Sequence, residues 1–523
     1  MTGARREGGL LRSTAVFSAM TLLSRIAGYA RDAIQATLFG TSAAVSAFVV
    51  AYRIPNYLRR IFAEGSFSSA FVPVLSELKQ KGDERALQDL LDHVAGALLA
   101  VVVLVTGLGM LLAPWIARLF LLFAGDHNAE LVPLTAEMLR ITFPYLAFIS
   151  MTALAGAVLN TFRQFGLPAL TPVLHNLAVI AAMLGLAAYF AIPEKALAWG
   201  VVAAGALQLL VLWPAMARIG VRPRLKFDPR HEGVRRVARL MLPTIFSSSV
   251  AQVNLLVGTV FASLLVPQAQ AWLYYSDRLT ELPLGLFGVA VGTVILPHLS
   301  RRHADADAAG YSKSIDWGLR IVLLVGLPAA LGLALLAEPL TATLFRHGEF
   351  TDEDTRMVGY ALVAMSLGIP TFMLSKVLLP AFYARQDTRT PMRAAVRTVV
   401  ANVLLTVAIV TPLWWWKVPA AHAGIAAATA LAGVLNALLL WRALRREGLY
   451  VAEAGWGRWM LRIAGGLLAM AVAVMAVREA VGPFAPMAWW WRVTWLLAAV
   501  AAGAGAYGAT LLVLGLRPRH LRH

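Results

Sequence analysis

The chain has 523 residues, of which 59% are hydrophobic and only 14% are charged, and its mean hydropathy of +0.69 excludes an ordinary soluble globular protein. It is predicted to be an all-α polytopic membrane protein. The formal net charge of +18 comes without a soluble domain or an aromatic-basic RNA motif, which argues against nucleic acid as a partner, and the lack of cysteine excludes disulfides, thiolate metal sites and a cysteine nucleophile.

Apolar stretches separated by short glycine, proline or charged turns predict about fourteen transmembrane helices. The first stretch follows basic residues, as a signal peptide does. However, Arg25 interrupts its apolar run and no convincing cleavage site follows, so we interpret it as a transmembrane helix. The predicted spans are 12–38, 43–78, 86–122, 131–160, 168–191, 196–219, 236–264, 269–300, 313–343, 354–384, 391–413, 420–445, 458–480 and 488–514.

Positive charge is concentrated in the connections that follow even-numbered spans, whereas the odd-numbered connections hold little of it. The positive-inside rule therefore predicts that both termini and all even connections are cytoplasmic. Every connection is short, which leaves no room for an extramembrane catalytic domain. The basic residues of the even connections are Lys79, Lys81, Arg85, Arg163, those within 218–239, Arg301, Arg302, Lys313, Arg385, Arg389, Arg442, Arg445, Arg446, Arg517, Arg519 and Arg522.

The chain contains an internal repeat. Residues 71–76 (FVPVLS) are answered 224 positions later by residues 295–300 (ILPHLS), and the Arg-Gln pair at 163–164 recurs at 385–386. We therefore predict two six-helix lobes, 1–224 and 225–447, followed by two further helices in 448–523. Because six is even, both lobes have the same orientation, and parallel repeats of this kind are a transporter architecture with the binding site between them.

Arginines in the first two spans predict a site for an anion. One arginine facing lipid at mid-bilayer costs about 2.5 to 3.5 kcal/mol, so a group of them requires a wet cavity or a negative ligand. On the first span Arg25 and Asp32 are seven residues apart and share a face, while Arg31 is expected to point elsewhere. The candidate cavity residues are Arg25, Arg31, Asp32, Arg53, Arg59, Arg60 and Glu64 from the first two spans, and Asp277, Arg278 and Glu281 from the eighth.

Internal neutralisation is the alternative for part of this group. Arg60 would then pair with Glu64, and Arg278 with Glu281, to fasten helices or mark a membrane boundary. The planar fork of arginine donates two hydrogen bonds to phosphate oxygens and stays charged, which suits a diphosphate better than lysine does. The ligand implied by the residues is a phosphorylated amphiphile.

Several segments resemble the MurJ (MviN) family of bacterial lipid II flippases. They are residues 20–32 (MTLLSRIAGYARD), 53–65 (RIPNYLRRIFAEG), 274–278 (YYSDR), 345–350 (FRHGEF) and 382–391 (FYARQDTRTP), and the similarity runs along essentially the whole chain. The resemblance implies the fold of the multidrug/oligosaccharidyl-lipid/polysaccharide exporter superfamily. It also implies that Arg25, Arg31, Asp32, Arg59 and Arg278 line the cavity and that the last two helices form a groove for the polyprenyl tail. The family usually has an aspartate early in the second helix, where this chain has Ser46.

The expected function is that of a flippase, and not of an enzyme. It would move the lipid-linked peptidoglycan precursor from the cytoplasmic to the periplasmic leaflet of the bacterial inner membrane by alternating access, for cell wall synthesis. No cofactor or resident metal is expected. The candidate drives are a coupling monovalent cation, with Asp387 as a weak candidate site, and the membrane potential acting on the cationic cavity.

Expected partners are the precursor, membrane lipids and proteins of cell wall synthesis or division. Another exporter of the same superfamily, for a polysaccharide-linked lipid or for cationic drugs, is the alternative function. A cavity for cationic drugs should be rich in carboxylates, and this one is rich in arginine. A membrane enzyme acting on polyprenyl phosphates would need paired carboxylates or a metal motif at the interface, which the sequence does not offer.

Overall fold

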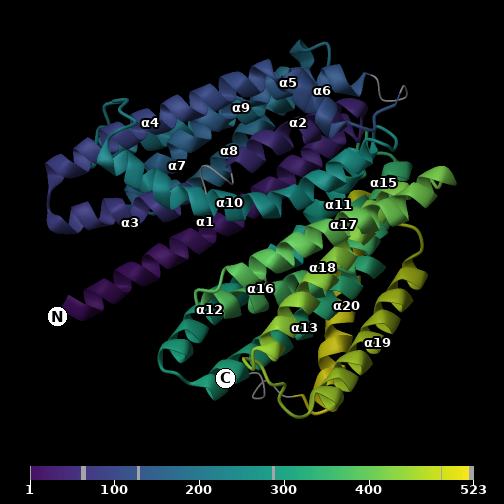
Figure 1. Cartoon of the computed structure of the whole chain (residues 1–523). Coiled ribbons are helices and arrows are strands. Elements are labelled where there is room, and N and C mark those ends of the chain that lie inside the picture. Colours follow the sequence, from purple (N-terminus) through teal and green to yellow (C-terminus); the bar gives the residue numbers. More distant parts are fainter. Residues whose placement is uncertain (1, 60–65, 126–129, 286–288, 485, 517–523) are drawn as a thin grey trace. The chain divides into compact units, whose positions relative to one another are not determined.

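The computed structural model describes residues 2–59, 66–125, 130–285, 289–484 and 486–516, and within these ranges it is helical without any strand (Figure 1). The helices are α1 (Thr2–Phe39), α2 (Ala43–Arg59), α3 (Ser66–Lys81), α4 (Glu84–Leu111), α5 (Ala113–Phe120), α6 (Leu131–Thr142), α7 (Tyr145–Thr161), α8 (Gly166–Leu186), η3 (Ala187–Tyr189), α9 (Lys195–Arg218), α10 (Glu232–Ala262), α11 (Ala269–Pro283), α12 (Val289–Ala304), α13 (Ala308–Leu335), α14 (Ala337–Phe345), α15 (Asp352–Ser366), α16 (Ile369–Tyr383), α17 (Arg389–Trp415), α18 (Ala421–Arg446), α19 (Trp456–Val481) and α20 (Trp489–Val513).

Nine helical stretches among the described residues are long and apolar enough to cross a membrane, or ten if α15 and α16, which meet at a bend of 41°, form one span. The prediction of an all-helical chain with many spans is confirmed. Several predicted spans, however, consist of two helices. Span 269–300 contains α11 and α12, and the α-helical part of α11 ends at Pro283, one turn after the point where its missing N–H removes a helical hydrogen bond.

The helices repeat along the chain at the offset that the sequence motifs indicated. The order α1 to α9 is followed by α10 to α18 with similar lengths. Helix α4 starts after Asp83, whose side chain accepts the N–H of Ala86, and α13 starts 224 residues later after Asp307, which accepts the N–H of Gly310. Both helices are interrupted at equivalent leucines, Leu112 and Leu336. Similar sequences therefore fold twice into the same succession of helices.

The chain forms two compact units, Met1–Gln270 and Ala271–His523. The core of the first unit lies between α3, α4, α7, α9 and α10 and includes Phe71 and Leu91. The core of the second lies between α12, α13, α16 and α18 and includes Phe382 and Leu440. Helices α19 and α20 pack against each other, and α19 also packs on α13. The lobe boundaries predicted at 224/225 and 447/448 follow the sequence repeat and stay a prediction.

Each unit contains a buried aspartate that holds the connection after the ninth helix of its repeat. Asp92 on α4 accepts hydrogen bonds from Gln88 Nε2 at 2.7 Å and from the backbone N–H of Arg224 at 2.8 Å, and Lys226 Nζ lies 3.0 Å from it. Gly96 allows this close approach, because a Cβ there would lie 2.1 Å from the carbonyl oxygen of Lys226. The connection is therefore fixed to α4 by its own backbone.

Asp316 on α13, 224 residues after Asp92, has the same role in the second unit. It accepts hydrogen bonds from Tyr450 Oη at 2.8 Å, from Trp456 Nε1 at 2.7 Å and from the backbone N–H of Glu453 at 3.3 Å. Arg320 Nε completes the set at 2.7 Å. Both carboxylates are almost fully buried, so their hydrogen bonds offset the cost of burying the charge.

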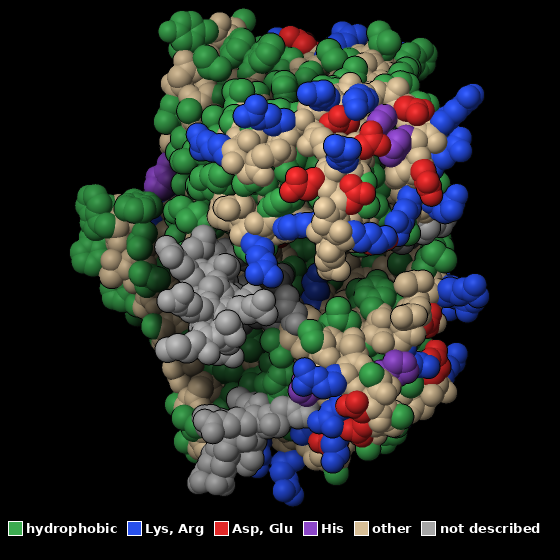
Figure 2. Space-filling model, turned by 90° about the vertical axis from the view of Figure 1, so that its left-hand side faces the viewer, with side chains coloured by type: hydrophobic (Ala, Val, Ile, Leu, Met, Phe, Trp, Pro, Cys, Tyr) green, Lys and Arg blue, Asp and Glu red, His purple; other side chains and the backbone are tan. Residues whose placement is uncertain are grey.

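Figure 2 shows lysine, arginine, aspartate, glutamate and histidine side chains gathered toward the right of the view, whereas hydrophobic side chains predominate toward its upper left. Large exposed hydrophobic side chains occur on many helices, for example Leu104 on α4, Leu210 on α9 and Leu461 on α19. Exposed apolar side chains along long helices are the surface expected of helices that lie in a bilayer.

Candidate functional site

Arg31 and Asp32 form a buried ion pair on α1. Arg31 Nη2 lies 2.6 Å and Nε 3.0 Å from Asp32 Oδ1, and Arg31 Nη1 donates to Asn176 Oδ1 on α8 at 3.1 Å. The expectation that Arg31 points away from Asp32 is therefore wrong. Successive helical residues differ by about 100° in direction, but the long arginine side chain can fold back far enough to reach its neighbour.

Asn176 also fastens α8 to α1, because its Nδ2 donates to the backbone carbonyl of Ser24 at 3.1 Å. The preceding residue, His175, is buried and lies beside two tyrosines. Its Nε2 is 3.4 Å from Tyr52 Oη on α2, and its ring centroid is 5.7 Å from that of Tyr145 on α7. Helix α8 thus contacts α1 through Asn176, and α2 and α7 through His175.

Arg53, next to Tyr52 on α2, is half-buried and reaches two residues that lie far from it in the sequence. Its Nη1 donates to Thr259 Oγ1 on α10 at 2.5 Å and to Gln270 Oε1 at 3.3 Å, while Gln270 Nε2 donates to the carbonyl of Thr259 at 2.7 Å. Among the described residues, the hydrogen bonds of Arg53 use Nη1 alone. Its Nε and Nη2 are thus available to an anion.

The other candidates of the first two helices contribute further positive charge. Arg25 on α1 is half-buried, and so is Arg59 on α2, whose Nε and Nη2 donate to Asn56 Oδ1 at 3.0 and 2.9 Å. Arg60 and Glu64 lie outside the described residues. In the described part of α1 and α2, the arginines of the predicted site outnumber its carboxylate, Asp32. This imbalance favours a negative ligand.

The candidates on α11 lie in the second unit. Arg278 Nη1 is 3.1 Å from Glu281 Oε2, the pairing proposed above as internal neutralisation, and the guanidinium lies 5.1 Å from the ring centroid of Tyr274. Asp277 and Arg278 are half-buried, whereas Glu281 is exposed. Because Glu281 is exposed to water, its ion pair with Arg278 is weak, and such pairs contribute about 0 to 1 kcal/mol to stability.

Asp387, the weak candidate for an ion site, lies in the connection before α17. Its Oδ1 accepts the backbone N–H groups of Arg389 at 2.9 Å and Thr390 at 3.1 Å. Burial raises the pKa of this carboxyl, but the hydrogen bonds from Thr390 and Arg389 lower it by more than burial raises it. The net shift of the pKa is therefore downward. These contacts are those of a turn that starts a helix.

Ser46, at the position where the family usually has an aspartate, is fully buried on α2. Its Oγ has no hydrogen-bond partner among the described residues. The nearby Ser42 differs, because its Oγ donates to Glu194 Oε1 at 2.6 Å and accepts the N–H of Val45 at 3.1 Å.

We therefore expect Ser46→Ala to leave stability within about 0.5 kcal/mol and activity unchanged, because an unpaired buried hydroxyl contributes little. Ser42→Ala is the matched variant, and we expect it to cost about 1 kcal/mol through loss of the helix cap. Thermal unfolding in detergent and an activity assay in cells measure both. Loss of activity in Ser46→Ala at normal abundance would contradict the prediction.

The sequence reasoning missed the neutral partners of the arginines, namely Asn176, Thr259 and Gln270. The available signal was weak, since each is a single polar residue in or beside an apolar stretch. It also missed a cluster of Asp89, His93 and His231. There the signal was stronger, because aspartate and histidine four residues apart share one face of a helix.

Comparison with known proteins gives one consistent result. The family model "Lipid II flippase MurJ" matches residues 35–494. A protein of Haemophilus influenzae described as a probable lipid II flippase MurJ is 41% identical over 514 residues, covering 96% of this chain and 99% of the relative. A lipid II flippase MurJ of Burkholderia cenocepacia is 42% identical over 467 residues, covering 88% and 89% of the two chains.

Solved structures agree with the sequence relatives. A lipid II flippase MurJ in an inward closed conformation matches with a TM-score of 0.79 and 25% identity, covering 95% of this chain and 98% of the other. An inward-facing multidrug resistance transporter of the MATE family, within the MOP superfamily, matches with a TM-score of 0.64 and 14% identity, covering 83% and 98% of the two chains. The second likeness shows a shared fold alone.

Proposed function

The chain belongs to the lipid II flippase MurJ family, and we propose that its arginines bind the diphosphate of the lipid-linked peptidoglycan precursor. The protein is a lipid II flippase, a multi-span helical transporter of the membrane. The observation that carries the proposal for the site is the excess of arginine over carboxylate on α1 and α2. A pair of phosphate groups offers several acceptor oxygens to guanidinium donors.

Each arginine would contribute differently. Arg53 offers Nε and Nη2 directly, because Thr259 and Gln270 engage only its Nη1. Arg31 is held by Asp32 and Asn176, so a phosphate oxygen would share or replace those acceptors. Asp32 would then act as a resident counter-ion that keeps the arginine charged and positioned when no ligand is bound. Arg25 and Arg59 add positive charge within the first unit, and Arg278 does so within the second.

We further propose that transport runs from the cytoplasmic to the periplasmic leaflet of the bacterial inner membrane by alternating access, with about fourteen spans and both termini in the cytoplasm. The membrane potential supplies one drive. An empty site with net positive charge is drawn toward the negative cytoplasm at about 2.3 kcal/mol per charge for each 100 mV. A coupling cation remains a separate proposal.

A drug/cation antiporter of the same superfamily is the alternative that the fold likeness allows. Recognition of a cationic drug requires uncompensated carboxylates or an aromatic cage. The buried carboxylate of the predicted site, Asp32, is already paired with Arg31 at 2.6 Å. The arginine excess therefore favours the anionic lipid over a cation.

Arg53→Ala tests the site with little risk to folding, because the side chain is half-buried and its two partners are uncharged. In cells depleted of their own flippase, we expect the full chain to restore growth and exposure of the precursor on the periplasmic leaflet. Loss of two charge-assisted hydrogen bonds should lower the Arg53→Ala rate about tenfold or more.

Arg118→Ala is the matched control, because Arg118 on α5 is exposed and stacks on Trp115. It should transport at the rate of the full chain. If the full chain exposes no precursor, the flippase activity is contradicted. If Arg53→Ala transports normally at equal abundance, only the role of Arg53 fails.

A further inference from the structure

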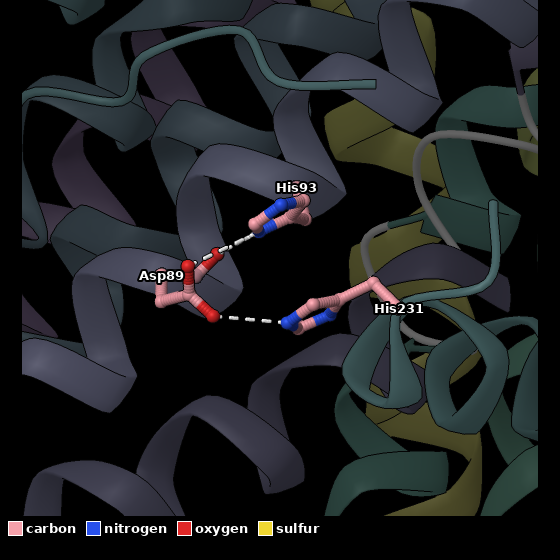
Figure 3. Close-up of side chains that lie close together, drawn as sticks. All are labelled: Asp89, His93 and His231. Carbon is pink, nitrogen blue, oxygen red and sulfur yellow. Dashed lines mark hydrogen bonds and ion pairs between the residues drawn. The ribbon is translucent and has the colours of Figure 1, made fainter. Parts of the chain in front are cut away.

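Asp89, His93 and His231, none of which belongs to the predicted anion site, form a compact cluster in the first unit (Figure 3). Asp89 and His93 lie one turn apart on α4, and His231 precedes the first residue of α10. Asp89 Oδ2 is 3.0 Å from His231 Nε2, and Asp89 Oδ1 is 3.4 Å from His93 Nδ1. The imidazole rings are stacked with centroids 4.2 Å apart and planes 5° from parallel.

We propose that this cluster binds a divalent transition-metal ion of the zinc class. One nitrogen from each imidazole and one carboxylate oxygen lie within 4.8 Å of one another, which is the donor set of a three-ligand zinc site. His93 Nδ1 also lies 2.8 Å from the backbone carbonyl of Asp89, so a metal ion bound through this nitrogen has to displace that contact. Water would complete the tetrahedron.

The exposure of the three side chains suits such a site. The imidazoles are mostly covered, with 15% of the His93 side chain and 22% of the His231 side chain exposed, whereas half of the Asp89 side chain faces solvent. The covered rings are held in place by the protein, and the open carboxylate leaves a path for the ion. Because the two rings are stacked and nearly parallel, at least one imidazole has to rotate so that both nitrogens point at the same ion.

Lys226 is the competing cation, but a second carboxylate holds it. Its Nζ lies 4.0 Å from Asp89 Oδ1 and only 3.0 Å from Asp92 Oδ2. The buried Asp92 can retain the ammonium group while Asp89 binds a metal. The three charges of Asp89, Asp92 and Lys226 sum to a negative value when both histidines are neutral, which favours a divalent cation.

The second repeat lacks this cluster, which gives the site a specific consequence. The positions 224 residues later are Lys313, Trp317 and Gly455, none of which can form the same donor set. In the second unit Asp316 holds the connection through donors from Tyr450, Glu453 and Trp456. Ser312 and Arg320 on α13 add hydrogen bonds to its backbone. A metal bound to His231 would cross-link α4 to the start of α10 and make the connection between the repeats stiffer.

The test is metal binding by the full chain, purified in detergent and stripped with a chelator. After dialysis against zinc, we expect one more zinc ion per chain than in the His93→Ala/His231→Ala variant, and a higher thermal midpoint with zinc than without. Each single variant, His93→Ala or His231→Ala, should bind zinc about tenfold more weakly or worse. Cobalt should give visible absorption bands of a nitrogen- and oxygen-ligated tetrahedral ion.

His303→Ala is the matched control, because His303 is an exposed histidine at the end of α12 and lies outside the cluster. It should retain full zinc binding. Equal zinc content in the full chain and the double variant would overturn the proposal. Binding is measured without transport, so this outcome is independent of the flippase assay. If an alanine variant fails to fold, zinc binding is measured on Asp89→Asn instead, because asparagine keeps the shape of the side chain.

Discussion

Replacing Arg31 by alanine should abolish transport and also destabilise the protein. Arg31 neutralises Asp32 at 2.6 Å, and both side chains are buried. Without the guanidinium, Asp32 stays buried without its ion-pair partner, which costs about 3 to 5 kcal/mol. We expect cells that depend on the variant to accumulate precursor on the cytoplasmic leaflet and to stop growing, with lowered abundance of the protein.

A second substitution separates the role in binding from the role in folding. Arg31→Ala combined with Asp32→Asn removes both charges and leaves a neutral side chain of similar shape at position 32. We expect this pair to restore abundance and thermal stability but not precursor exposure, because the diphosphate still lacks Arg31. If the double variant transports at the normal rate, Arg31 is only a structural counter-ion and the assignment of Arg31 to the substrate site is wrong.

Replacing Asp316 by alanine should produce the largest loss of stability in the second unit. The variant removes the acceptor for Tyr450, Glu453 and Trp456 and leaves Arg320 without its partner. Loss of these contacts should cost about 2 to 4 kcal/mol. For a unit of this size the thermal midpoint in detergent should fall by roughly 5 to 15 °C.

Limited proteolysis gives a second, local measurement for the same variant. The chain between α18 and α19 is fixed to α13 by Asp316, so the variant should be cut there faster than the full chain. Asp305→Ala is the control, because Asp305 is exposed in the turn before α13. An unchanged midpoint together with unchanged cleavage in Asp316→Ala would contradict the anchoring role.

The repeat shows which features of the fold can be predicted from residues that are neighbours in the sequence. The motifs at 71–76 and 295–300 predict two equivalent lobes, and the structure places them on α3 and α12 with the same helix order around them. Aspartates that cap α4 and α13 recur at the same offset. Capping, helix length and apolar runs depend on neighbours along the chain, so they can be read from it.

Contacts between distant residues could not be read in this way. Arg31 meets Asn176, 145 residues away, and Arg53 meets Thr259, 206 residues away. Periodicity assigns a side chain to one face of its helix, but not to a partner on another helix. It also misjudged the neighbouring pair Arg31 and Asp32, because it fixes the direction of Cβ and leaves the long arginine side chain free.

By itself, therefore, the sequence determined the class of the protein, the repeat and the excess of arginine on its first helices. Composition, spacing and charge are properties of the chain that folding does not alter. Only the tertiary structure decided that Arg31 is engaged by Asp32 and Asn176, that Arg53 keeps donors available, and that His231 meets Asp89 and His93. These outcomes depend on which helix faces pack together, and packing joins residues that no local pattern relates.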